Sequence, residues 1–107
     1  MLTLKNKIVV HIPHKAFIDE KFVDIDYLAC RNNLIQMLEG CGVGGFYITN
    51  VVGHYKNRSY DEELLTFFYN KTNDDIENKI YSWIESDARV LKQECIAVEF
   101  DGILKII

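Results

Sequence analysis

The side chains best suited to chemistry lie in one aromatic and charged stretch between residues 47 and 63. They are Tyr47, His54, Tyr55, Arg58, Tyr60, Glu62 and Glu63. Tyrosine and arginine beside charged neighbours are typical of recognition surfaces, because they combine a large contact area with directional polar groups. We expect a binding surface here. The same tyrosines would equally suit half-buried positions of a sheet.

Paired carboxylates perform general acid–base chemistry when they lie in a desolvated cleft with separated pKa values. Such pairs occur at Asp19-Glu20, Glu62-Glu63, Asp74-Asp75, and Glu85 with Asp87. All of them fall at expected turns or element starts, where solvated charge is normal. Asp74 and Asp75 are also favourable at the start of a helix. We keep these two residues, together with Glu94, as binding candidates.

Cysteine and histidine patterns give weak signals for covalent or metal chemistry. The three cysteines, Cys30, Cys41 and Cys95, are far apart and include no C-x-x-C pair. This spacing excludes a zinc ribbon and makes a disulfide framework unexpected. A nucleophilic Cys41 would need a nearby base, and His11, His14 and His54 would need to converge to hold a metal. We therefore predict no catalytic residue, no metal and no cofactor.

Four of the six glycines lie between residues 40 and 45. Glycine-rich loops that cradle phosphate connect a strand to a helix, so that the helix N-terminus faces the anion. Here the expected order is helix, loop, strand. The segment therefore predicts a helix end and a tight entry into a strand.

Length and composition indicate one domain over residues 1–107, with 49% hydrophobic and 26% charged residues. Residues 1–58 carry a net charge of +2 and residues 59–107 a net charge of −6. An acidic second half argues against nucleic-acid binding and favours a protein partner with a basic surface. No apolar run reaches the roughly 18–20 residues of a membrane helix. We expect a cytoplasmic protein with reduced thiols and no membrane contact.

The hydrophobic pattern predicts strands over residues 7–12, 45–55, 60–70, 95–100 and 103–107. Residues 14–23 have little pattern and are expected to be a connection, and Gly53 is a possible bulge. Residues 56–59 are expected to be a four-residue loop, and Asp101-Gly102 a two-residue turn. The segment 61–69 could alternatively be helical, because of its acidic start.

Two helices are predicted by apolar positions at helical spacing. The first begins at a cap on Asp24, ends at Gly40 and has the apolar positions Ile25, Leu28, Ile35 and Leu38. The second begins near Thr72, with Asp75 three residues later as a weak capping box. Its apolar stripe consists of Ile76, Ile80, Trp83, Ile84 and Leu91.

This order predicts an α+β, ferredoxin-like β-α-β-β-α-β fold. It would have an antiparallel sheet, two helices on one face and a short C-terminal hairpin strand. The other sheet face would remain open, and the many aromatic residues favour covering it by a partner. We expect a homodimer.

Four short segments resemble a family of small uncharacterised proteins of bacteria and their phages. They are Gly44-Gly45-Phe46 with Thr49, Gly53-His54-Tyr55, Glu62-Glu63, and Leu91-Lys92-Gln93-Glu94. The resemblance covers roughly residues 40–100 and implies the ferredoxin-like fold. It carries no activity, and it makes Gln93 and Glu94 worth testing. A mobile-element origin would imply an inhibitor of a host defence system, similar to an anti-CRISPR protein.

Three functions follow as hypotheses. The first is a non-enzymatic, acidic interaction module that occupies a basic surface of its target. The second is an oligomeric ferredoxin-like small-molecule-binding protein or enzyme, with a pocket near the glycine-rich loop, His54 and Glu94. The short loop at 56–59 argues against this second reading, because sensory trimers of this fold have a long loop there. The third is an assembly subunit that only pairs.

Overall fold

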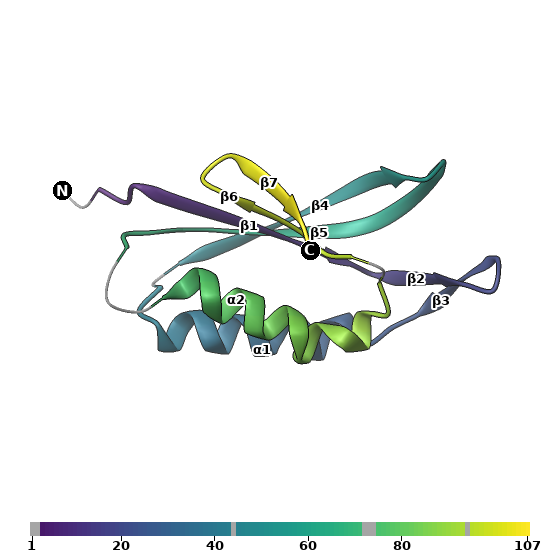
Figure 1. Cartoon of the computed structure of the whole chain (residues 1–107), viewed down its shortest axis with the longest axis horizontal. Helices are drawn as coiled ribbons and strands as arrows, with labels where there is room; N and C mark the ends of the chain where they lie inside the picture. Colours follow the sequence, from purple (N-terminus) through teal and green to yellow (C-terminus); the bar gives the residue numbers. More distant parts are fainter. Residues whose placement is uncertain (1–2, 44, 72–74, 94) are drawn as a thin grey trace.

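The computed structural model describes residues 3–43, 45–71, 75–93 and 95–107, and these form an α+β fold of two layers (Figure 1). A five-stranded antiparallel sheet has the strand order β4-β5-β1-β6-β7. Two helices, α1 and α2, lie side by side against one face of this sheet. The predicted α+β class is therefore confirmed.

The five strands of the sheet agree with the expected segments. They are β1 (Asn6–Pro13), β4 (Phe46–Tyr55), β5 (Arg58–Tyr69), β6 (Ala97–Phe100) and β7 (Ile103–Ile106). Residues 61–69 belong to a strand, so the helical alternative for this segment is wrong. Their β-branched and aromatic side chains alternate between the two faces, as a half-buried strand requires.

The expected connection over residues 14–23 is instead a second, two-stranded sheet made of β2 (Lys15–Ile18) and β3 (Lys21–Asp24). Its turn residues Asp19 and Glu20 both adopt left-handed conformations, with φ of 53° and 64°. Acidic residues rarely signal such a turn, so the hairpin was not predicted. As a result α1 follows the third strand and not the first, and the helices occupy different positions in the chain order from those predicted.

Helix α1 spans Tyr27–Gly40, and its N-cap is Asp26, whose carboxylate accepts a hydrogen bond from the Ala29 amide. The predicted cap at Asp24 was wrong because that residue ends β3. The predicted apolar stripe was also partly wrong, since Leu28 is 47% exposed. The buried positions are Cys30, Leu34 and Leu38. The helix does end at Gly40, and Gly42 takes the left-handed conformation that follows it, with φ of 82°.

Helix α2 spans Ile76–Glu85 and is capped by Asp75, whose side chain accepts a hydrogen bond from the Asn78 amide. Thr72, the other half of the expected capping box, lies outside the described residues. A short 3-10 helix, η1 (Asp87–Leu91), continues from α2. Leu91 is buried as predicted, although it belongs to this separate turn.

The β4–β5 hairpin closes more tightly than the predicted four-residue loop. Its turn consists of Lys56 and Asn57, with φ of 51° and 62°, which is the two-residue type that matches the twist of the strands. The same geometry occurs at Asp101 and Gly102 between β6 and β7, where it was predicted. Pairing runs without interruption through Gly53, so there is no bulge at that residue.

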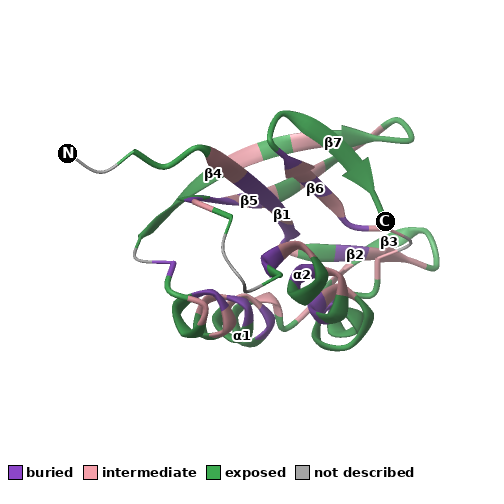
Figure 2. Ribbon diagram, turned by 60° about the vertical axis from the view of Figure 1, so that its left-hand side comes forward, coloured by how far each residue is buried: buried purple, intermediate pink, exposed green. Residues whose placement is uncertain are grey.

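The core lies between the sheet and the helices (Figure 2). Ile8, Val10 and Ile12 of β1 face it, and their partners Phe67 and Leu65 on β5 lie on the same side. Residues between them point to the opposite face, which we call the open face. No helix among the described residues is long and apolar enough to cross a membrane.

Candidate functional site

A concave pocket of about 320 Å³ lies on the open face. Its walls come from β1, β2, the turn end of the β4–β5 hairpin, β6 and β7, together with Lys92, Gln93, Cys95 and Ile96. His11 and Pro13 alternate with the core-facing residues of β1 and therefore contribute to the floor of the pocket. This volume falls within the range of small-molecule sites.

One polar feature of the pocket is the pair formed by Glu62 and His11. The Nδ1 atom of His11 lies 3.6 Å from Oε2 of Glu62, on adjacent strands. The backbone of Gly53 lies beside the same carboxylate, since a Cβ atom at this position would be 2.7 Å from Oε1 of Glu62. The glycine therefore leaves the space that the carboxylate of Glu62 occupies.

A second polar feature is Arg58, which the β2–β3 hairpin holds in place. Its guanidinium carbon lies 3.9 Å from the ring centroid of Phe17, and its Nε donates a hydrogen bond of 3.2 Å to the Tyr60 hydroxyl. Phe22 packs edge-on against Tyr60, with centroids 5.4 Å apart. Gln93 donates hydrogen bonds to the carbonyls of Lys15 and Leu91, which ties β2 to the opposite wall.

The structure brings five of the predicted site residues together in the pocket. These residues are His54, Tyr55, Arg58, Tyr60 and Glu62. Tyr47 lies further along β4, is 55% exposed and does not line the pocket. Asp75 caps α2, while Asp74 and Glu94 lie outside the described residues. The described residues of the glycine-rich loop do not line this pocket.

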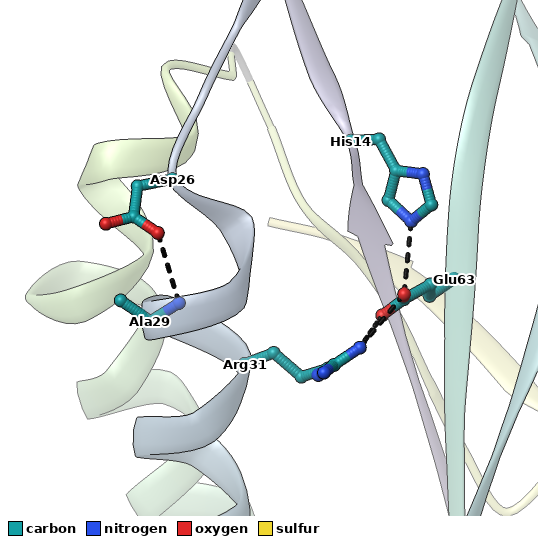
Figure 3. Close-up of polar contacts among 5 residues, drawn as sticks. All are labelled: His14, Asp26, Ala29, Arg31 and Glu63. Atoms are coloured by element: carbon teal, nitrogen blue, oxygen red, sulfur yellow. Dashed lines mark hydrogen bonds and ion pairs between the residues drawn. The ribbon is translucent and has the colours of Figure 1, made fainter.

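Glu63 is separated from these residues because it points to the helix-facing side (Figure 3). Both of its carboxylate oxygens accept hydrogen bonds from Nη1 of Arg31, at 2.9 and 2.8 Å. Nε2 of His14 lies 3.3 Å from the same carboxylate, and the His14 ring stacks on Tyr27 at 4.2 Å. This buried cluster joins α1 to β1 and β5, so the geometry gives Glu63 a structural role.

Sequence reasoning missed several pocket residues. The alternation of Ile8, Val10 and Ile12 was a usable signal, because it already placed His11 on the face opposite the core. Phe17 gave no signal, since the β2–β3 hairpin was not predicted. Leu104 and Ile106 reach the pocket only because β7 returns along β6.

The cysteines and histidines do not form a covalent or metal site within the described ranges. Cys41 accepts a hydrogen bond from Lys79 Nζ at 3.3 Å, away from the pocket. Burial, assisted by the charges of Asp87 and Asp26, raises the pKa of Cys30 to about 12, so its thiol is a poor nucleophile. No group of three metal-ligating side chains occurs in the described part of the chain.

The fold and the pocket together define a class: a small α+β protein with a ligand-sized cavity on the open face of its sheet. No family model matches the chain, and no curated protein matches it in sequence. A solved structure described as a phage SAM lyase in the apo state superposes with a TM-score of 0.56 and 10% identity. The match covers 97% of this chain and 87% of that chain. At this identity the similarity concerns the fold alone.

Proposed function

We propose that the protein binds S-adenosylmethionine, or a close analogue, in the open-face pocket and acts on it as a lyase. The observation that carries this proposal is the pocket itself, which places a carboxylate, an arginine and tyrosine rings around one cavity. The fold similarity to a phage SAM lyase supplies the ligand class. The proposal is the enzyme form of the second hypothesis drawn from the sequence.

The chemistry of this ligand suits the lining of the pocket. S-adenosylmethionine carries an aromatic base, a cationic sulfonium and a zwitterionic amino-acid group. Tyr55 and Tyr60 offer aromatic surface for a base or for a cation. Glu62 places negative charge where a sulfonium would be stabilised. A largely apolar pocket with a few convergent polar groups is typical of small-molecule sites.

Glu62 is the side chain that we assign to the reacting end of the ligand. Its carboxylate lies against Gly53, and Nδ1 of His11 lies 3.6 Å from one of its oxygens. A positioned carboxylate can either accept a proton or stabilise positive charge during bond cleavage. Both roles require Glu62 to be ionised while the ligand is bound.

Calorimetry with S-adenosylmethionine, together with chromatography of the reaction mixture, tests the proposal. We expect saturable binding and cleavage products. Glu62→Gln should lower the rate about 100-fold, because it keeps the size of the side chain and removes its charge. Tyr47→Phe is the matched control, since Tyr47 lies on the same sheet outside the pocket. Absence of binding by folded wild-type protein at millimolar ligand would refute the proposal.

A second candidate is the interaction module, including an anti-CRISPR-like inhibitor that occupies a basic surface. Exposed apolar side chains on the two edge strands favour it, among them Val52 on β4 and Ile103 and Ile106 on β7. Edge strands of this kind can pair with another chain, which also supports the expected homodimer. Affinity capture from cells that carry defence systems tests it, with Ile103→Lys plus Ile106→Lys as the variant expected to lose the partner.

We also propose that the sheet and helices form a ferredoxin-like core with an inserted hairpin. The order β4-β5-β1-β6 and the placement of α1 and α2 on one face support it. In this interpretation β2–β3 is inserted after the first core strand, and β7 is added at an edge. Replacing residues 15–24 by a short glycine-serine linker should then leave a folded protein, as judged by a cooperative thermal transition.

A further inference from the structure

We propose that Arg58 is the carboxylate receptor of the pocket and that the β2–β3 hairpin holds it ready for this role. The inference rests on the proposed function, because it requires the open-face pocket to bind a small molecule. It adds the chemical group that sets specificity: a ligand with a free carboxylate is preferred over an otherwise identical ligand without one.

The first argument is the unused hydrogen-bonding capacity of Arg58. Its Nε donates to the Tyr60 hydroxyl, whereas its terminal nitrogens make no hydrogen bond within the described ranges. The ion pairs found there use other cations, namely Lys7, His11, His14, Lys15 and Arg31. Arg58 is half-buried in the pocket wall. A half-buried guanidinium whose terminal nitrogens have no carboxylate partner in the described structure favours an incoming oxyanion.

The second argument is that the orientation of Arg58 is fixed before a ligand arrives. Phe17 stacks against its guanidinium at 3.9 Å, and Tyr60 accepts from Nε. Phe17 in turn contacts Phe22 edge-on, with centroids 5.1 Å apart, and Phe22 contacts Tyr60. A planar guanidinium that is held on an aromatic face loses little entropy when it forms two parallel hydrogen bonds to a carboxylate.

The third argument is the charge pattern of the pocket. Glu62 and Arg58 project from the same face of β5, four residues apart, and both line the cavity. A ligand that carries separate positive and negative groups can satisfy both side chains at once. An uncharged ligand would cover both charged side chains without offering either of them a group of opposite charge, which is unfavourable. The amino-acid end of S-adenosylmethionine has this combination of charges next to its sulfonium.

The experiment compares two ligands that differ only in the carboxylate: S-adenosylmethionine and decarboxylated S-adenosylmethionine. Calorimetry with the wild-type protein should give at least about tenfold tighter binding of the carboxylate form. Arg58→Gln should abolish this preference and leave the affinity for the decarboxylated ligand nearly unchanged. Lys21→Gln is the control, because it removes an exposed positive charge of β3 outside the pocket.

Two further variants test the role of the hairpin. Phe17→Leu removes the stacking surface and keeps Arg58, so the preference for the carboxylate form should fall about threefold or more. Arg58→Lys keeps the positive charge and loses the planar guanidinium, so it should retain only part of the wild-type preference for the carboxylate form. Circular dichroism confirms that each variant is folded before its affinity is interpreted.

The outcomes separate the two proposals. If the wild-type protein binds neither ligand, the proposed function fails. If it binds both equally, or if Arg58→Gln weakens both by the same factor, the ligand site stands and the assignment of Arg58 is overturned. A lost preference in Arg58→Gln with retained binding of the decarboxylated ligand supports the assignment.

Discussion

Glu62 and Glu63 are neighbours in β5, yet they lie in opposite surroundings. Glu63 faces the helices and is 7% exposed. Its carboxylate accepts hydrogen bonds from Arg31, and His14 lies beside it. Glu62 faces the open side, and its ion-pair partner in the described structure is His11, at 3.6 Å. The pleat of one strand thus supplies a structural carboxylate and a carboxylate that remains available to a ligand.

The two carboxylates have different structural surroundings although they are adjacent in the sequence. The carboxylate of Glu63 connects β5 to α1 through Arg31. The strand that carries Glu62 is therefore held on its helix-facing side. Within the described ranges the carboxylate of Glu62 has His11 beside it at 3.6 Å, and Gly53 leaves space for this carboxylate.

The largest effect is expected on removing Glu63. Glu63→Ala removes the carboxylate that pairs with the largely buried guanidinium of Arg31. This substitution should lower the free energy of unfolding by about 3 kcal/mol. Glu62→Ala should lower it by less than about 1 kcal/mol. Urea unfolding of both variants measures the difference. Equal losses would show that the two carboxylates share one role.

Gly53→Ala is expected to affect the open face and spare the helix-facing side. The added Cβ would lie 2.7 Å from Oε1 of Glu62 and must displace this carboxylate. The affinity of the pocket for S-adenosylmethionine should fall about tenfold, which corresponds to a loss of about 1.4 kcal/mol of binding free energy. The thermal midpoint should change by only a few degrees. Gly45→Ala is the control, since its Cβ would meet nothing within 4 Å.

Alkaline pH should lower the free energy of unfolding through two groups on the helix-facing side of the sheet. Burial raises the pKa of Cys30 from 9.0 and that of Tyr69 from 10.0, each to about 12. Above pH 9 the unfolded chain therefore loses protons that the folded protein keeps, so the free energy of unfolding falls as the pH rises. The slope should reach about 1 kcal/mol per pH unit.

Urea unfolding between pH 8 and 11 measures this slope. Cys30→Ala should reduce it, because this variant lacks the buried thiol whose pKa is raised. An unchanged slope in Cys30→Ala would contradict the assignment of the effect to the buried thiol.

The smallest effect is expected at Asp101, in the turn between β6 and β7. Hydrogen bonds from the Lys7 amide and the Asn6 side chain hold the pKa of this carboxyl below its usual range. Stability from this group is present above the unfolded pKa and is lost as the pH falls through the folded value.

Asp101→Asn introduces a residue that also tolerates the left-handed conformation of the turn. It should lower the free energy of unfolding by about 0.5 kcal/mol at neutral pH. The difference from the wild-type protein should vanish in acid. A difference that persists at pH 2 would indicate a packing effect and not a charge effect.

The parts of the fold that were predicted correctly had strong local signals. β1, β4 and β5 are rich in β-branched and aromatic residues, α2 has an apolar stripe, and Asp101-Gly102 is a favoured hairpin turn. The β2–β3 hairpin was missed because its strands are only four residues long and its turn consists of Asp19 and Glu20. The cap of α1 was misplaced for the same reason, since Asp24 belongs to that hairpin.

The candidate site was predicted in part. His54, Tyr55, Arg58, Tyr60 and Glu62 are close in sequence and remain close on one hairpin. Glu63 was grouped with them, because composition alone does not say which face a residue occupies. The other walls of the pocket come from β6, β7 and the residues Lys92, Gln93, Cys95 and Ile96. These are far away in the sequence and reach the pocket only through sheet pairing.

The α+β class, the principal strands and the cluster of polar and aromatic residues near position 55 could be read from the amino-acid sequence. Local hydrophobic period and residue type carry that information. Only the tertiary structure decided that Glu62 and Glu63 separate, that Arg58 stacks on Phe17 and that a cavity forms between distant strands. The physical reason is that strand register assigns each side chain to a face, and register depends on pairing between segments far apart in the chain.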